Sequence, residues 1–557
     1  MAVETPTLEV QAGKMAERLY HNCEVYTVDA SRPRAEAVAV RGEEIVAVGS
    51  VEECRAAPGT GHEEVDLGGG ALLPGFIDTH IHPVMLAFFE MNAALGKARS
   101  IADVQDILSE SAAEAGEGAW VLGLDFDDQK LAEKRMPGRQ EIDRAVGGRP
   151  AVIVRYDGHM LIANTAAIEA SGVDASTGDP PGGFIDREPD GYPAGPFREA
   201  AAQVVLSLMP PPDIPAFLES ARNTFDRLAA RGITSLGAVL QTDAEGPGGE
   251  QGTLDLVAMQ LLLEGMPQTV FSMLIARDIE NIVEARRTPL EQPGGAGHRV
   301  GAMKIFADGS LGSRTAFLSR PFSDAPDNSG FLIYDEAELY RRMVAAHNLG
   351  LQIATHAIGD AAIRTVVDLY ERLQREHPRA DARHRLEHAS VLDERLIEDM
   401  ARLGVVAAVT PLYVRTEKAW LGERLGERVR MTYPFRSMLD AGVRLAGSSD
   451  APVESTDVLS AIHCCVTRDG FETQECLTAA EAVRIYTLDA AYAQHQEEVR
   501  GSISPGKRAD MVLLDANPVD VAAESISDIK VLRTIAGGET CFQAPDASGG
   551  TGIAPHR

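Results

Sequence analysis

Short apolar runs separated by turn residues occupy the two ends of the chain. Near the N-terminus they lie at 23–28, 35–40, 45–48 and 65–67. This spacing is typical of a small β-sandwich, and two more strand-like runs follow at 511–514 and 531–535. We therefore expect 1–74 and 501–543 to build one composite β-domain, with 544–557 as a flexible tail.

Between these ends, strand and helix patterns alternate over residues 75–500. The strand-like runs are 76–82, 233–239, 270–276, 300–307, 351–356, 384–388, 405–409 and 443–448. Eight parallel strands, each followed by a helix, predict an α/β fold, a (β/α)8 TIM barrel.

The linkers in the second half carry the start and stop signals of helices. Asp335 with Glu338 three positions later predicts an N-terminal cap with a reciprocal carboxylate, and Gly350 ends that helix. Asp393 and Gly404 bound another helix in the same way. These signals support the alternation of strand and helix.

The linker after the first barrel strand, about 84–231, is much longer than a crossover helix. It contains the strand-like run 151–156 and the turn-rich stretch 180–183. Loops at the carboxyl ends of barrel strands carry function. We therefore expect an inserted subdomain that lies over the barrel mouth and shapes a substrate pocket.

Composition narrows the class of protein further. The 557 residues include 52 lysines and arginines against 83 acidic residues, a net charge of −31. Such a charge argues against nucleic-acid and membrane partners. Residues 1–17 lack the apolar core of a signal peptide, and the six cysteines include no C-x-x-C pair. We expect a cytoplasmic enzyme with buried, free thiols.

His80 and His82 end the first barrel strand. Side chains alternate across a strand, so Asp78, His80 and His82 point to one face. Two neutral imidazoles on one face bind divalent metals. Because such pairs also occur on solvated strands, this pair alone is weak evidence.

Four more candidate ligands lie in or just after later strands: Lys304, His356, His388 and Asp450. Taken singly, each histidine is more often a hydrogen-bonded core residue, and Asp450 before Ala-Pro suits a turn. The carboxyl ends of barrel strands meet at one face, however. Together the six residues predict a metal centre there.

Lys304 lies in the apolar run 302–306, where an unpaired ammonium is costly to bury. Desolvation and nearby metal ions favour the neutral amine, which takes up carbon dioxide to form a carbamate that bridges two metals. The alternatives are a pair with Asp308 or a side chain that extends to solvent.

The stretches 75–83, 303–310, 355–360, 385–389 and 448–453 resemble, in order, motifs of the amidohydrolase superfamily, in its amidohydrolase 3 branch of YtcJ-like proteins. The resemblance implies a distorted barrel with one or two Zn²⁺ ions. His80, His82 and Asp450 would hold the buried ion, and His356 and His388 the outer one, with carbamylated Lys304 as the bridge.

The resemblance also implies a reaction. Water held by the metal supplies hydroxide, and Asp450 is the catalytic residue that moves its proton to the leaving nitrogen. We expect hydrolysis of a non-peptide, amide-like C–N bond in a small molecule, such as an N-substituted formamide or another N-acyl compound. The alternatives are a deaminase of an aminated ring and a non-catalytic scaffold. A homodimer would be ordinary for this family.

Supporting roles are expected for two groups of residues. Candidates to orient the imidazoles are Asp308, Glu387 and His384. Candidate substrate contacts are Asp157, His159, Glu199 and Arg314. The stretch 309–313 lacks the lysine of a phosphate-binding loop and is expected to be a mobile active-site loop.

Overall fold

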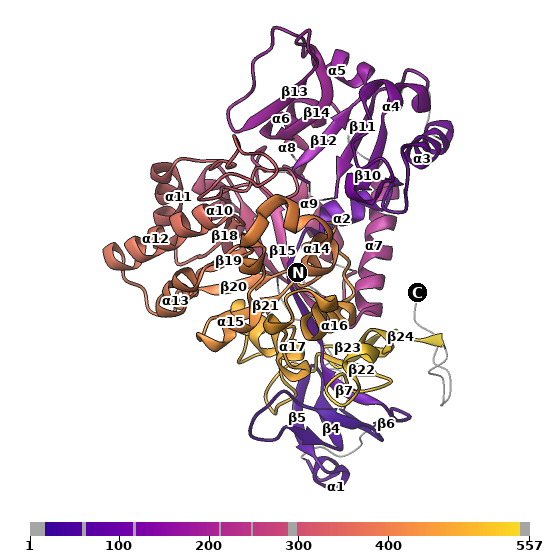
Figure 1. Ribbon diagram of the computed structural model, residues 1–557. Coiled ribbons are helices and arrows are strands. Elements are labelled where there is room, and N and C mark those ends of the chain that lie inside the picture. The colour runs from indigo at the N-terminus through magenta and orange to yellow at the C-terminus, as the bar shows by residue number, and fades with distance from the viewer. Residues whose placement is uncertain are drawn as a thin grey trace, which may run out of the picture.

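The computed structural model describes residues 17–57, 63–114, 119–156, 158–210, 213–246, 249–263, 265–287 and 298–545. Figure 1 shows a central barrel, with the inserted subdomain above it and the β-sandwich below. No helix within these ranges is long and apolar enough to cross a lipid bilayer.

Eight parallel strands form the barrel in the described part of the chain, and each lies within two residues of its predicted limits. In order around the sheet they are β8 (Phe76–Ile81), β15 (Ile233–Gln241), β16 (Thr269–Ile275), β17 (His298–Phe306), β18 (Gln352–Ala357), β19 (Arg385–His388), β20 (Val406–Val409) and β21 (Arg444–Gly447). The prediction of a (β/α)8 barrel is confirmed.

The barrel is distorted at the seam between β8 and β21, which form no regular ladder. Single hydrogen bonds join them instead. The Thr79 hydroxyl donates to the Gly447 carbonyl at 2.9 Å, and the Asp450 N–H donates to the His80 carbonyl at 2.8 Å. Two of the candidate ligands are therefore fixed to each other through their backbones.

Helices surround the barrel and bury one apolar face each against it. They include α7 (Ile214–Ala230), α9 (Asp255–Leu263), α10 (Ile279–Arg287), α11 (Glu336–Asn348), α12 (Asp360–Glu376), α13 (Glu394–Leu403), α14 (Leu412–Leu425), α15 (Phe435–Asp440), α16 (Val458–Thr467), α17 (Ala479–Ile485) and α18 (Leu488–Ala493).

The caps of α11 and α13 follow the sequence signals with one exception. Asp335 and Asp393 accept hydrogen bonds from backbone N–H groups of the first turn, and Gly404 ends α13 with a left-handed φ of +65°. The reciprocal contact predicted for Glu338 is wrong, because its carboxylate binds Arg341 and Arg342.

Both ends of the chain contribute to the β-sandwich. One sheet contains β5 (Glu44–Gly49), β4 (Ala37–Arg41), β1 (Glu17–His21) and β6 (Glu63–Asp66). The other contains β24 (Glu539–Gln543), β23 (Val531–Ala536), β22 (Met511–Leu514), β7 (Ala71–Pro74), β2 (Glu24–Tyr26) and β3 (Arg34–Ala35).

The antiparallel pair of β22 and β7 joins the two ends, with Leu513 opposite Leu72. Since β7 continues through Gly75 into β8, the sandwich sets the position of the first barrel strand. Sequence patterns missed β1, β7 and β24. Of the predicted tail, 546–557 lie outside the described residues.

The inserted subdomain has its own mixed sheet and its own apolar cores. Its strands are β13 (Gly183–Arg187), β14 (Pro193–Glu199), β12 (Met160–Ala163), β11 (Ala151–Arg155), β10 (Val121–Phe126) and β9 (Ala93–Ala94). Its helices are α3 (Ile101–Glu114), α4 (Arg139–Val146), α5 (Thr165–Ser171) and α6 (Ala200–Leu206).

The inserted subdomain is shorter than the predicted range, 84–231. Helix α7 packs Phe217 and Phe225 into the apolar cluster that contains Phe76 and Leu236 of the barrel. It therefore acts as the crossover helix before β15, and α2 (Pro83–Phe89) packs beside it.

Candidate metal centre

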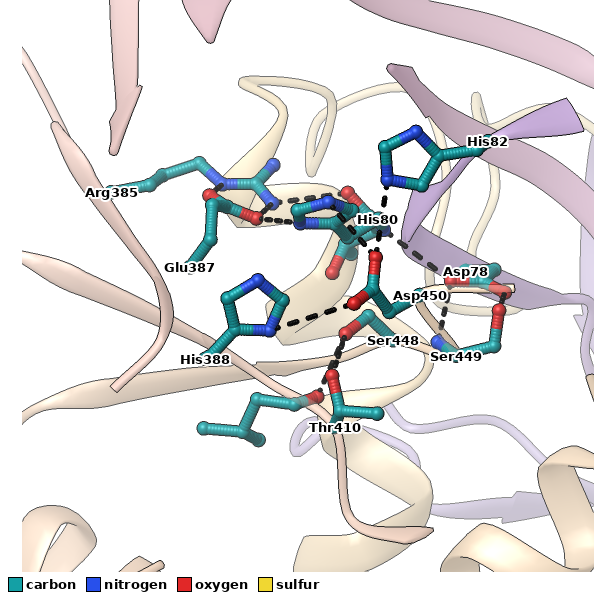
Figure 2. Close-up of polar contacts among 12 residues, drawn as sticks. Asp78, His80, His82, Arg385, Glu387, His388, Thr410, Ser448, Ser449 and Asp450 are labelled. Carbon is teal, nitrogen blue, oxygen red and sulfur yellow. Dashed lines mark hydrogen bonds and ion pairs between the residues drawn. The ribbon is translucent and has the colours of Figure 1, made fainter. Parts of the chain in front are cut away.

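Asp450 lies at the centre of a group of buried imidazoles (Figure 2). Its Oδ1 atom is 3.3 Å from His80 Nε2 and 3.2 Å from His82 Nε2. Its Oδ2 atom is 3.9 Å from His388 Nδ1. Residues far apart in the sequence thus meet at the carboxyl ends of β8, β19 and β21.

The ligand atoms of His80, His388 and Asp450 all lie within 4.8 Å of one another. His80 Nε2 and His388 Nδ1 are buried, and neither has a hydrogen-bond partner among the described residues. Leaving such atoms unsatisfied is costly. A divalent metal would satisfy both nitrogens and neutralise the carboxylate, so this set of donors fits a metal ion.

Burial favours the neutral form of three of the imidazoles, those of His82, His356 and His388, and metal binding requires this form. Burial lowers the pKa of His82 to about 4 and that of His388 to about 3, despite the opposing effect of Asp450. Burial, with the neighbouring His388, also holds the pKa of His356 well below its usual value. Neutral rings present lone pairs, as ligands must.

Local backbone strain positions two of these residues. Asp450 has φ +55° and His388 has φ +73°, in the left-handed region that side chains other than glycine rarely adopt. Asp78 holds the loop before Asp450, because its carboxylate accepts hydrogen bonds from the Ser449 N–H at 3.0 Å and the Ser449 hydroxyl at 2.5 Å. These hydrogen bonds hold the residue that precedes Asp450 and so help to fix its strained conformation.

Glu387 orients His80. Its Oε2 atom is 2.5 Å from His80 Nδ1, and the buried Arg385 guanidinium binds both carboxylate oxygens at 2.8 Å. Although burial opposes it, Arg385 with His80 lowers the pKa of Glu387 to about 2. The ionised carboxylate accepts a hydrogen bond from the Nδ1–H group, which leaves the Nε2 lone pair facing the site. Sequence reasoning missed Arg385.

The other two expected positioning residues behave differently. Asp308 accepts hydrogen bonds from the backbone N–H groups of Phe317, Ile358 and Gly359, so it fixes the loops around His356. His384 lies at the opposite end of the barrel and binds His347, so its expected contact with a ligand is not formed.

The His356 ring donates from Nε2 to the Gly309 carbonyl at 3.1 Å, which leaves Nδ1 for a metal.

Lys304 is buried, and its Nζ atom is 4.0 Å from the centre of the Phe306 ring. Burial lowers the pKa of Lys304 to about 8. The alternative pair with Asp308 is not formed, because that carboxylate binds backbone amides instead. The amine therefore loses its proton more easily than a solvated lysine.

A cavity of about 530 Å³ opens beside these residues. Candidate ligands on its wall are His82, Lys304, His356, His388 and Asp450. Aromatic side chains, among them Phe89, Tyr156, Phe306, Tyr413 and Tyr433, lie on the rest of the wall together with charged ones such as Glu245, Arg277 and Arg342. The cavity therefore offers a partly apolar space next to the candidate metal centre.

The inserted subdomain contributes His159 and Glu199 to the cavity wall. His159 Nδ1 is 2.9 Å from Glu199 Oε2, and the Thr315 hydroxyl donates to Glu199 Oε1 at 2.6 Å. The His159 ring lies 5.3 Å from the His356 ring. Both residues thus lie on the cavity wall, and their contact with a substrate stays a prediction.

Three further expectations have different outcomes. Arg314 does not line the cavity and pairs with Asp324 at 2.9 Å. Asp157 lies outside the described residues. The stretch 309–313 is buried, and Ser310 binds Thr315 and Ser313. These contacts make it a packed wall of the site instead of the mobile loop that was predicted.

A parallel barrel with imidazoles and a carboxylate clustered at its carboxyl-terminal face defines a metal-dependent hydrolase. Residues 63–542 match the amidohydrolase family, and the chain belongs to that family. The resemblance to this family that the sequence predicted is confirmed, and the protein is a hydrolase of C–N bonds.

Proteins of known sequence and structure match almost the whole chain. The N-substituted formamide deformylase of Arthrobacter pascens is 30% identical, over 94% of this chain and 98% of the relative. The putative amidohydrolase YtcJ of Bacillus subtilis is 28% identical, over 94% and 99%. The crystal structure of an uncharacterized metal-dependent hydrolase from Pyrococcus horikoshii has a TM-score of 0.72 and 24% identity, over 91% and 99%.

Proposed function

We propose that the protein hydrolyses the N-acyl bond of a small N-substituted amide, with N-substituted formamides as the leading substrates. The observation that carries the proposal is the pair of unsatisfied ring nitrogens, His80 Nε2 and His388 Nδ1, which flank Asp450 beside the cavity. The similarity to a formamide deformylase supports the choice of substrate.

We further propose Zn²⁺ as the metal, with one or two ions per chain. His80, His82 and Asp450 would hold the inner ion, His356 and His388 the outer one, and a carbamate on Lys304 would lie between them. The buried amine of Lys304, with a pKa of about 8, supports this modification. Bound zinc would supply an activated water and polarise the substrate carbonyl.

The chain's own residues have three tasks in this reaction. The Asp450 carboxylate accepts a proton from the attacking water and passes it to the leaving nitrogen. His159 and Glu199 orient the acyl end of the substrate from the insertion. The aromatic wall receives the apolar substituent of the amine and excludes bulk water.

The test is a measurement of metal content and amine release on one preparation. N-formyl, N-acetyl and cyclic amides are offered with and without a chelator, and the Asp450→Asn variant controls for contaminating amidases. The proposal predicts chelator-sensitive release of amine and acid, fastest with N-formyl compounds. Ammonia release from aminated rings without amide cleavage would make the protein a deaminase and overturn the proposal.

A further inference from the structure

Tyr413 reaches Asp450 from the neighbouring strand–helix unit. It is the second residue of α14, and its N–H donates to the Thr410 carbonyl at 3.1 Å. The Thr410 hydroxyl lies 3.1 Å from the Ser448 hydroxyl, which donates to the Val409 carbonyl at 3.0 Å (Figure 2). These bonds tie the end of β20 to the end of β21, so the position of Tyr413 relative to Asp450 is fixed.

The Tyr413 hydroxyl donates to Asp450 Oδ2 at 2.7 Å. The side chain is buried and lines the cavity, and its ring is 5.9 Å from that of His388. The opposite oxygen, Oδ1, faces His80 Nε2 and His82 Nε2. The two carboxylate oxygens therefore have different partners.

Asp450 needs such a constraint because its backbone does not fix its carboxylate. The N–H of Asp450 donates to the His80 carbonyl, and its carbonyl accepts from the Val453 N–H. Rotation about the bond that carries the carboxylate is soft even when the backbone is rigid. A directional hydrogen bond to one oxygen removes that freedom, and a bond to a charged acceptor is among the stronger ones.

We infer that Tyr413 is a positioning residue, which holds the plane of the Asp450 carboxylate so that Oδ1 faces the metal-binding imidazoles. The inference deepens the proposed function and rests on it for the role of Asp450. Loss of the hydroxyl should affect how Asp450 ligates the metal and moves a proton, with little effect on how the cavity binds substrate.

The test compares Tyr413→Phe with Tyr20→Phe. Tyr20 is a matched control, because it is also buried and its hydroxyl donates to the Gly538 carbonyl at 2.9 Å, in the β-sandwich. Each protein is loaded with Co²⁺, and its visible absorption spectrum, kcat and KM are measured. We expect Tyr413→Phe to shift the cobalt bands and lower kcat about tenfold to a hundredfold with KM within about twofold. Tyr20→Phe should match the wild type.

A second pair of variants asks whether Tyr413 acts through Asp450. In an Asp450→Asn background, adding Tyr413→Phe should produce no further spectral shift. The inference is overturned by an unchanged cobalt spectrum in Tyr413→Phe, by an equal shift in both backgrounds, or by failure of the protein to take up cobalt. If the wild type cleaves no amide, the proposed function fails while the spectra still decide the role of Tyr413.

Discussion

The Nδ1 atom of His80 is 2.5 Å from the Oε2 atom of Glu387, a carboxylate that Arg385 holds on both oxygens. This contact fixes the tautomer of His80 and turns its Nε2 lone pair toward Asp450. In the barrel interior, Arg385 therefore holds Glu387, and Glu387 orients the ring of His80 for metal binding.

Replacing Glu387 by Gln should weaken metal binding about tenfold to a hundredfold, because the neutral amide is a weaker acceptor of the hydrogen bond from His80 Nδ1–H. Competition with a coloured chelator measures the affinity. Glu371→Gln is the control, since this partly exposed residue pairs with Arg402 at 2.7 Å, away from the candidate ligands. Unchanged affinity in Glu387→Gln would show that the contact does not prepare the ligand.

Asp450→Asn should keep the metal and lose turnover by about a hundredfold to ten-thousandfold. The amide keeps an oxygen that faces His80 and His82, yet it cannot accept the proton of the attacking water. Metal content and kcat, measured on the same sample, check both parts. A variant with near wild-type kcat would remove the proton-transfer role.

Lys304→Ala should lower the number of metal ions bound per chain, because the bridging carbamate is lost. Atomic emission spectroscopy gives the count, and ¹³C NMR after exposure to labelled bicarbonate detects the carbamate in the wild type. Lys418→Ala serves as control, since this partly exposed lysine binds Asp469 away from the candidate ligands. An unchanged metal count in Lys304→Ala would contradict the bridge.

Glu199→Gln should raise KM about tenfold while metal content stays constant, because the amide holds the His159 ring less firmly. Steady-state kinetics on an N-formyl substrate measure the change. Glu188→Gln, a change in the same subdomain that removes a contact with Arg139, should leave KM unaltered. A fall in metal content in Glu199→Gln would instead show that His159 and Glu199 hold the metal ligands in place.

Stability should fall as the pH drops, because of the His347–His384 pair. The His384 Nδ1 atom accepts from the Ile353 N–H, its Nε2–H donates to His347 Nδ1 at 2.9 Å, and His347 Nε2–H donates to the His377 carbonyl at 2.7 Å. In this series of hydrogen bonds each ring uses one nitrogen as an acceptor, so neither ring can bind a second proton without breaking a bond. Burial lowers the pKa of His347, and it lowers the pKa of His384 well below its usual value.

In the unfolded chain both rings take up protons near pH 6.5. The unfolded state therefore binds more protons below that pH, and stability is lost as the pH falls. Because the folded chain holds the pKa of His384 well below its usual value, this ring should cost up to about 1.4 kcal/mol per pH unit below 6.5. Urea unfolding at pH 7.5 and 5.5 should show a loss about 1 kcal/mol smaller in His384→Gln than in the wild type. Equal losses would exclude the pair as a source of acid sensitivity.

The barrel and its ligands could be predicted from the sequence because their signals are local. An apolar run that ends in His80 and His82, or in His356, carries both the strand and its chemistry in a few adjacent residues. Parallel strands then bring those ends together without further information.

The supporting residues could not be predicted in the same way, because their roles depend on contacts between distant segments. Arg385 looks like a solvated charge on a strand, yet it lies in the barrel interior. Tyr413 looks like an ordinary helix residue, and only the join between β20 and β21 brings it to Asp450. Arg314 was misplaced because nothing in its local sequence reveals its pair with Asp324.

The most direct test of the metal centre is the metal content and amide hydrolysis of one preparation, before and after dialysis against a chelator. One or two divalent ions per chain, with activity lost on removal and regained on adding Zn²⁺, is the expected result, and His388→Ala should bind less metal. Full hydrolysis by a metal-free chain would contradict the account.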